Sequence, residues 1–166
     1  MNRRYDRYLV QKYEPLYRDR YAPMTHTAMC WGFSVGDGWF NIINRLSALL
    51  CSEWLRAKAD YDYIKDREGC LMFDGKPSEF NTIITAERIQ SAKIAMDEAA
   101  EKVPVATQVK EKYGTLRFYT STSTNEQQAY ITFAESMSAV TCEVCGNRGK
   151  RIQYGWIETR CGKHEK

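Results

Sequence analysis

The sequence predicts an α+β fold of about three helices and one β-hairpin, followed by a small cysteine-rich module at the C-terminal end. Apolar residues recur at helical spacing in three long stretches, and residues 105–120 alternate in character about a Tyr-Gly turn. With 43% hydrophobic and 27% charged residues among 166, the chain can bury a modest core. We expect one helical α+β domain over residues 1–141 and the module over residues 142–166.

The first long helix is expected to begin near Trp39. A shorter helix, rich in Tyr and Arg, is expected over residues 3–14, ending near Pro15. The segment Gly36-Asp37-Gly38 then interrupts the chain, and Asp37 has a side chain suited to a helix N-cap. Apolar residues follow at spacings of three and four: Trp39, Ile42, Ile43, Leu46, Leu49, Leu50 and Trp54. This stretch predicts the helix that supplies the central core face.

A second helix is expected from about Thr85 to Glu101. Its predicted buried face consists of Ile89, Ala92, Met96 and Ala99. The charged segment 60–68 is either a continuation of the first long helix or an exposed excursion, and Gly and Pro residues mark turns after it. No role is assigned to residues 58–84.

The hairpin and the third helix bring the chain to the module. The hairpin over residues 105–120 has Tyr113-Gly114 as its turn. The third helix is expected to start at Thr124, because Thr124 and Gln127 have the spacing of a capping box. Its predicted buried stripe is Tyr130, Phe133, Ala134, Met137 and Val140.

The C-terminal module carries two paired metal-ligand motifs. Cys142 and Cys145 form a CxxC pair, and after fifteen intervening residues Cys161 and His164 form a CxxH pair. A CxxC pair turns two thiolates toward one point about 2.3 Å away, the usual Zn–S distance, and a CxxH pair adds a thiolate and an imidazole. The residues between the pairs suit a hairpin that turns at Tyr154-Gly155. The pattern predicts one zinc ion in a module that resembles a zinc ribbon or an abbreviated treble clef.

The four ligands indicate structural zinc. They would fill a tetrahedral coordination sphere, whereas a catalytic ion keeps one position open for water or substrate. A module this small buries little apolar surface, so we expect metal binding to supply most of its folding free energy, on the order of 10 kcal/mol.

Basic and aromatic residues surround the ligands. They are Arg148, Lys150, Arg151, Tyr154, Trp156 and Arg160. Such interleaving is typical of surfaces that hold phosphates and stack bases, and these six residues are the predicted nucleic-acid or partner-binding surface. The alternative interpretation is that Trp156 covers the small metal core while the basic residues only keep the module in solution.

Charge and hydropathy restrict the setting of the protein. Residues 1–20 and residues 142–166 each hold six basic and three acidic residues, so both segments are positively charged. Such segments could meet phosphate or an acidic protein surface, although charge runs are usually solvated. No stretch approaches the roughly 18 apolar residues of a membrane span, and no secretory signal pattern is present. We therefore expect a cytoplasmic protein without membrane contact, and free thiols at the scattered cysteines Cys30, Cys51 and Cys70.

Candidate catalytic residues are few. His26 and Cys30 are four residues apart, but no acidic third partner is indicated for a nucleophile pair. Asp37 between two glycines is explained more simply as a cap. No GxGxxG or Gly-Lys-Ser/Thr arrangement supports nucleotide binding. We expect that the protein is not an enzyme.

Several segments carry a resemblance to a known family. They are residues 23–25, 29–33, 36–39 and 109–119, and the tail motif from Cys142 to His164. Together they resemble small proteins of tailed bacteriophages and prophages that end in a CxxC…CxxH module, with residues 58–104 matching least. The resemblance implies a context, expression inside an infected bacterial cell, and no particular chemistry.

The sequence therefore predicts a non-enzymatic, phage-encoded accessory protein with one structural zinc. We expect it to bind a host protein or protein complex, such as a component of antiviral defence. The alternative is a nucleic-acid-binding zinc-ribbon protein.

Overall fold

The structure, a computed structural model, describes residues 1–165, and of Tyr154 it describes the backbone alone. The chain divides into two compact units. The first unit consists of Met1–Leu50 and Pro104–Lys166, and the second of Cys51–Val103. The metal-ligand motifs lie in the first unit.

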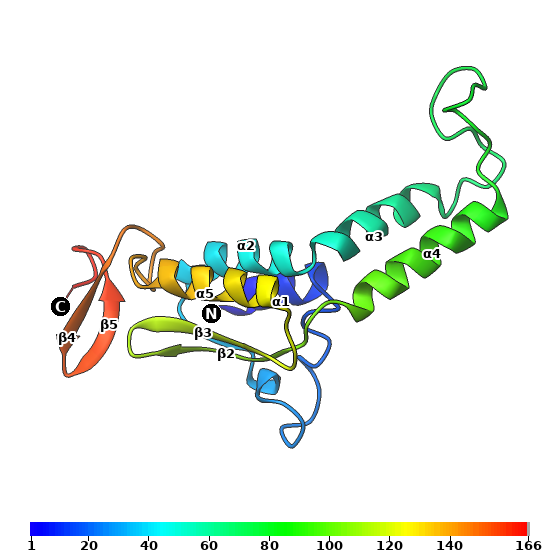
Figure 1. Cartoon of the computed structure of the whole chain (residues 1–166). Helices are drawn as coiled ribbons and strands as arrows, with labels where there is room; N and C mark the ends of the chain where they lie inside the picture. The colour runs from blue at the N-terminus through cyan, green and yellow to red at the C-terminus, as the bar shows by residue number, and fades with distance from the viewer. Residues whose placement is uncertain (166) are drawn as a thin grey trace. The chain divides into compact units, whose positions relative to one another are not determined.

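Five α-helices are present in the described residues, so the expectation of about three was wrong. They are α1 Arg3–Lys12, α2 Phe40–Leu50, α3 Ser52–Ile64, α4 Ala86–Glu101 and α5 Asn125–Ser138 (Figure 1). The miscount arises partly at Cys51, where φ of −103° and ψ of 12° interrupt the stretch that was expected to form one helix. Apolar periodicity continues from Leu50 to Trp54 across this break and so does not signal it.

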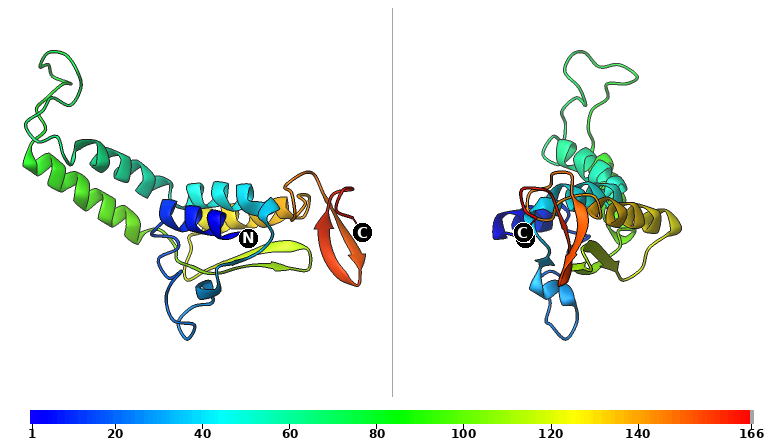
Figure 2. Two further views of the ribbon diagram at one scale, coloured as in Figure 1. Left: turned by 180° about the vertical axis from the view of Figure 1, so that it is seen from behind. Right: turned by 90° about the vertical axis from the view of Figure 1, so that its left-hand side faces the viewer.

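A three-stranded sheet forms one layer of the first unit. Strand β1 (Phe33–Ser34) pairs in parallel with β2 (Ala106–Lys112), which pairs antiparallel with β3 (Thr115–Thr120). The β2–β3 hairpin and its Tyr113-Gly114 turn confirm the prediction. Helices α2 and α5 pack side by side on one side of this sheet (Figures 1 and 2). The β3–α5 contact includes a hydrogen bond of 2.8 Å from the Leu116 N–H to Ser138 Oγ.

The core of the first unit lies between these layers. Its largest fully buried side chains include Leu9, Tyr13, Leu16, Tyr17, Met29, Trp39, Ile43, Leu46, Leu116 and Ile131. The Tyr17 hydroxyl forms a buried hydrogen bond of 2.7 Å with Ser47 Oγ, which satisfies both polar groups inside the apolar layer.

Helix α5 begins as predicted but buries a different face. Thr124 and Gln127 form the predicted capping box. The buried residues of the helix are Ile131, Ala134 and Ser138, whereas Phe133 is 64% exposed and Met137 and Val140 are also exposed. The predicted stripe was therefore wrong at Phe133, Met137 and Val140 and right at Ala134, while Tyr130 is half-buried. Ser138 can be buried because its hydroxyl is fully hydrogen-bonded, so the inward face does not stand out as apolar.

The second unit is a pair of helices with a connecting loop. Helices α3 and α4 pack against each other, and its core cluster comprises Ile64, Ile84 and Ala92. The first part of the segment 60–68 continues helix α3. Thr85 caps α4, whose buried residues Ala92 and Ala99 confirm the predicted face. None of the described helices has both the length and the apolar character needed to cross a membrane.

The C-terminal hairpin forms the other sheet. Strands β4 (Lys150–Tyr154) and β5 (Trp156–Arg160) pair antiparallel, with Ile152 opposite Glu158. Gly155 occupies the turn with a φ of 93°, a conformation that glycine adopts without a steric penalty. The predicted hairpin between the two ligand pairs is confirmed.

Candidate metal centre

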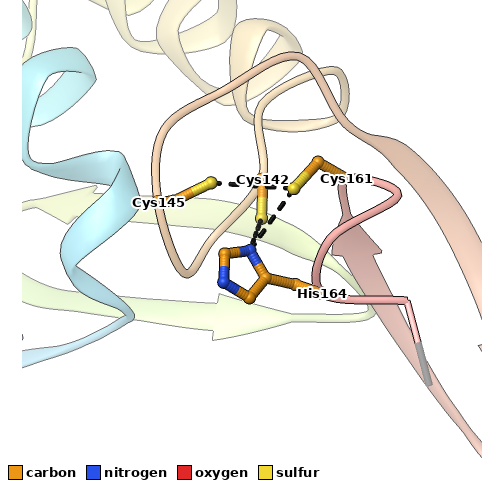
Figure 3. Close-up of side chains that lie close together, drawn as sticks. All are labelled: Cys142, Cys145, Cys161 and His164. Carbon is orange, nitrogen blue, oxygen red and sulfur yellow. Dashed lines mark hydrogen bonds between the residues drawn. The ribbon is translucent and has the colours of Figure 1, made fainter.

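The four predicted ligand residues converge on one point. The Sγ atoms of Cys142, Cys145 and Cys161 and a ring nitrogen of His164 all lie within 4.8 Å of one another. Figure 3 shows the three thiols and the imidazole directed toward a common centre. This group of three cysteines and one histidine could hold one metal ion.

The separations of the ligand atoms suit a tetrahedral centre. Cys145 Sγ lies 3.7 Å from Cys161 Sγ, and His164 Nδ1 lies 3.5 Å from Cys142 Sγ and 3.3 Å from Cys161 Sγ. For Zn–S bonds of about 2.3 Å and a Zn–N bond of about 2.0 Å, tetrahedral angles place two sulfurs about 3.8 Å apart and a sulfur about 3.5 Å from a nitrogen. These three of the six separations are close to these edges, and the other three are at most 4.8 Å.

Two short turns present the ligands. In the first, the Gly146 N–H donates to the Cys142 carbonyl at 2.8 Å, and Gly146 has a φ of 77°. In the second, the His164 N–H donates to the Cys161 carbonyl at 2.8 Å. The antiparallel β4–β5 hairpin connects the two turns and brings them close to each other. The CxxC and CxxH spacings thus produce the geometry that they predict.

The first turn packs directly against the segment before α2. A Cβ atom on Gly38 would lie 2.2 Å from the Cys142 carbonyl oxygen and 2.7 Å from the Cys145 nitrogen, so only glycine fits there. Gly36 is similarly close to Glu143, where a Cβ would lie 2.3 Å from the carbonyl oxygen. These glycines allow two backbones more than 100 residues apart in sequence to meet.

Hydrogen bonds join the same two segments. The Gly38 N–H donates to the Glu143 carbonyl at 2.8 Å, and the Gly36 N–H donates to Glu143 Oε1 at 2.9 Å. The buried Trp39 indole N–H donates to the Thr141 carbonyl at 2.7 Å. The metal-ligand turn is therefore fixed by the core of the first unit.

The supporting role of Gly36 and Gly38 was not predicted from the sequence, in which these glycines were interpreted only as a break in the chain before a helix. Asp37 is not the side-chain cap that was expected. Its carboxylate accepts hydrogen bonds from the Asn2 backbone N–H at 2.7 Å and from Asn2 Nδ2 at 2.6 Å. The glycine pair itself was the available signal, since two glycines flanking one residue allow a close backbone approach.

Local hydrogen bonds favour a thiolate at Cys142. Burial raises the pKa of the Cys142 thiol. Hydrogen bonds from the backbone N–H groups of Cys145, Cys161 and Val144, and from His164, outweigh this effect and lower the pKa to about 6. The pKa of Cys145 is raised, because burial and the neighbouring thiols outweigh a hydrogen bond from the Asn147 backbone. A lowered pKa at Cys142 favours the deprotonated form of the thiol that binds metal ions.

The predicted partner-binding residues have different environments. Arg160 is largely buried, lies 3.2 Å from Glu143 Oε2 and also pairs with Glu158. Lys150 pairs with Glu165 at 3.1 Å. These two side chains therefore neutralise carboxylates of the module.

The remaining members of that set differ in exposure. Arg148 is exposed, and Arg151 Nη2 donates to the Tyr113 carbonyl at 3.0 Å. Trp156 is 86% exposed at the start of β5, so it does not cover the metal centre. The side chain of Tyr154 lies outside the described part of the chain. Binding by these residues stays a prediction.

The other candidate residues lie apart from the cluster. His26 Nε2 lies 3.4 Å from Asp19 Oδ2 on an exposed segment. All six cysteines are free thiols. Of the three that are not ligands, Cys51 is buried, Cys30 is half-buried and Cys70 is exposed.

Comparison of the chain with models of protein families, with curated proteins and with solved structures found no match. The chemistry of the centre is therefore inferred from its own side chains. Three thiols and one imidazole supply four soft or borderline donors, a set suited to one tetrahedral metal ion.

Proposed function

We propose that this chain is a non-enzymatic binding protein whose C-terminal module, a zinc ribbon or treble-clef-like fold, is held together by one structural Zn²⁺. In this proposal the protein is an accessory factor of a tailed phage that acts in the host cytoplasm. Its partner is a host protein or protein complex, such as a component of antiviral defence. The zinc stabilises the surface that the partner contacts and takes no part in a reaction.

The donor set supports zinc and a structural role. A Cys₃His set is among the commonest structural zinc ligands, and four protein donors leave no position for water or substrate. Cys142 and Cys161 are buried, so two of the ligands are largely shielded from competing solvent. The close contact between Gly38 and Cys142 suggests that metal binding also orders the segment before α2.

The observation that carries the binding proposal is the exposure of Trp156. Its indole is 86% exposed at the tip of a hairpin whose two ends both lead into metal ligands. A tryptophan gains more from burial than most side chains, and tryptophans are enriched at the energetic centres of protein interfaces. An exposed indole on a hairpin whose ends are held by the proposed metal ion is therefore best explained as an anchor for a partner. The phage resemblance makes a host protein the expected partner.

A second function, nucleic-acid binding, is favoured by one separate observation. Helix α1 presents Arg3, Arg4 and Arg7 around a shallow hollow of about 470 Å³ that Tyr8 and Gln11 also line. None of these three arginines forms an ion pair within the described residues, and Arg148 on the module is also exposed. Such a surface would neutralise phosphates, and its affinity would fall steeply as salt rises.

One experiment separates the two functions. The zinc-loaded full chain is immobilised and exposed to bacterial lysate at low salt, with and without nuclease, alongside Trp156→Ala and Trp31→Ala. Trp31 is a matched control, because it is 63% exposed in the same unit but far from the hairpin in sequence. We expect a stoichiometric protein partner that survives nuclease treatment and is lost only with Trp156→Ala. Nuclease-sensitive capture, or equal capture by all three proteins, would contradict the proposal.

A further inference from the structure

We propose that a pocket between the tips of the two hairpins in the first unit binds a cationic side chain, lysine or arginine, of a protein partner. This inference rests on the proposed function, since it names the chemistry that the surface around Trp156 recognises. The pocket has a volume of about 370 Å³ and lies between the β2–β3 turn and strand β5. Its walls include Glu111, Lys112, Tyr113, Glu143, Trp156 and Glu158.

The two hairpins are held together, so the backbone around the pocket is fixed. A Cβ on Gly114 would lie 3.1 Å from the Glu158 backbone carbon, which shows that the β2–β3 turn packs closely against β5. Thr159 Oγ1 donates to the Gly114 carbonyl, and Arg151 Nη2 donates to the Tyr113 carbonyl at 3.0 Å. A prearranged site loses less conformational entropy when a ligand binds.

Two aromatic side chains contribute to the pocket and remain exposed. Trp156 is 86% exposed and Tyr113 is 60% exposed. Tyr113 has a φ of 54°, and it is the only non-glycine residue with positive φ among the described residues. Asn, Asp and Gly are the usual residues at this position of a two-residue hairpin turn. A tyrosine here strains the turn without filling the core, so its ring is better explained by contact with a ligand.

The carboxylates of the pocket outnumber its cations. Glu143 and Glu158 share one cation, Arg160. Glu111 Oε1 accepts a hydrogen bond from the Gly114 N–H at 2.6 Å, but the carboxylate forms no ion pair within the described residues. Among the described lining residues Lys112 is the one cation, and Arg151 lies beside the pocket with its Nη2 at the Tyr113 carbonyl. Glu111 is therefore the lining carboxylate that remains available to a partner's cation.

The Tyr113 ring already accepts a cation. Lys112 Nζ lies 5.4 Å from the centroid of this ring, within the range of a cation–π contact. Lys112 itself is exposed, so a partner's ammonium or guanidinium group could take the same kind of place on the ring faces. Aromatic faces beside carboxylates together recognise a cation by π-contact and by ion pairing.

The same charges disfavour a nucleic acid at this pocket. A phosphate close to Trp156 would approach the carboxylate of Glu111, which forms no ion pair within the described residues and would repel it. In this proposal Trp156 contacts a basic protein surface, and the arginines of α1 are the alternative place for a nucleic acid.

Binding can be measured with peptides. The ¹⁵N-labelled, zinc-loaded full chain is titrated with an alternating Arg-Ser peptide, a matched Glu-Ser peptide and a single-stranded oligothymidylate at one salt concentration. We expect the Arg-Ser peptide alone to shift the Trp156 indole N–H and Gly114 amide signals. Trp156→Ala and Tyr113→Asn should each weaken this binding about tenfold, the size of a partly desolvated cation–π contact. Asn suits the turn, so its effect on binding would not come from unfolding.

The control and the contrary results are defined in the same titrations. Trp31→Ala should bind the Arg-Ser peptide as the wild type does. Equal binding by all variants, a preference for the Glu-Ser peptide, or oligothymidylate shifting the same two signals would overturn the inference. If a host protein is retained equally by wild type and Tyr113→Asn, the pocket is wrong while the binding function stands. If the Arg-Ser peptide binds but no host protein is retained, the pocket stands while the proposed binding of a host protein is wrong.

Discussion

Gly38 and Cys142 meet backbone to backbone, so closely that a Cβ on Gly38 would lie 2.2 Å from the Cys142 carbonyl oxygen. The contact joins the start of the helical core to the first metal ligand across more than 100 residues of sequence. It makes the metal centre part of the first unit, because the ligand turn and the segment before α2 hold each other in place through Glu143 and Trp39.

Substitution of Gly38 by alanine should weaken metal binding. The new methyl group must displace the backbone of the ligand turn, which distorts the spacing of Cys142 and Cys145. We expect chelator competition to show zinc affinity reduced by at least about tenfold, comparable to the loss of a supporting group in other metal sites. Gly162→Ala is the control, because a Cβ at Gly162 would meet no other atom within 4 Å. Equal affinities for the two variants would show that the close contact is unimportant.

Replacement of Tyr113 by asparagine should raise stability. Tyr113 has a φ of 54° and an exposed ring, so the change relieves backbone strain and costs little packing. Asparagine tolerates this conformation, and we expect a gain of about 0.5–1 kcal/mol in the free energy of unfolding. Thermal unfolding followed by circular dichroism tests this. A loss of stability would mean that the ring supports the fold rather than a ligand.

The buried face of α5 can be tested by a pair of substitutions. Ile131 is almost fully buried, and its replacement by alanine should lower the free energy of unfolding by about 2–4 kcal/mol. Phe133 is 64% exposed, so Phe133→Ala should cost less than about 1 kcal/mol. Urea denaturation of both variants provides the comparison. A larger loss of stability in Phe133→Ala than in Ile131→Ala would mean that the buried face is the one predicted from the sequence.

Loss of one metal-ligating side chain should unfold the module and leave the helices folded. In Cys142→Ser, amide hydrogens of β4 and β5 should exchange much faster, because in our proposal a bound zinc ion supplies most of the local folding free energy, on the order of 10 kcal/mol. The far-ultraviolet helical signal should change little. Cys70→Ser, at an exposed cysteine outside the cluster, should leave exchange unchanged. Protection of β4 and β5 that survives Cys142→Ser would contradict a structural role for the metal.

Local sequence signals predicted the local parts of this protein. The CxxC and CxxH spacings identified all four members of the cluster, and the Tyr113-Gly114 turn and the Thr124 cap were correct. These features depend on residues close together in the sequence, so their chemistry can be read without the fold.

The errors arose where distant contacts decide the structure. Two overlapping apolar stripes run along α5, and the one that is buried includes Ser138, whose hydroxyl accepts from Leu116 on β3. Hydropathy alone favoured the stripe with Phe133. The role of Gly38 likewise depends on its contact with Cys142. Tyr113 and Trp156 line the same pocket only because the two hairpins pack together.

The coordination sphere of the metal can be measured directly. X-ray absorption at the zinc edge, on full-length protein purified without chelator, should show one zinc per chain. We expect three sulfurs at about 2.3 Å and one nitrogen at about 2.0 Å from the metal. Absence of zinc, or an oxygen ligand from solvent in place of one of these donors, would contradict a closed structural site.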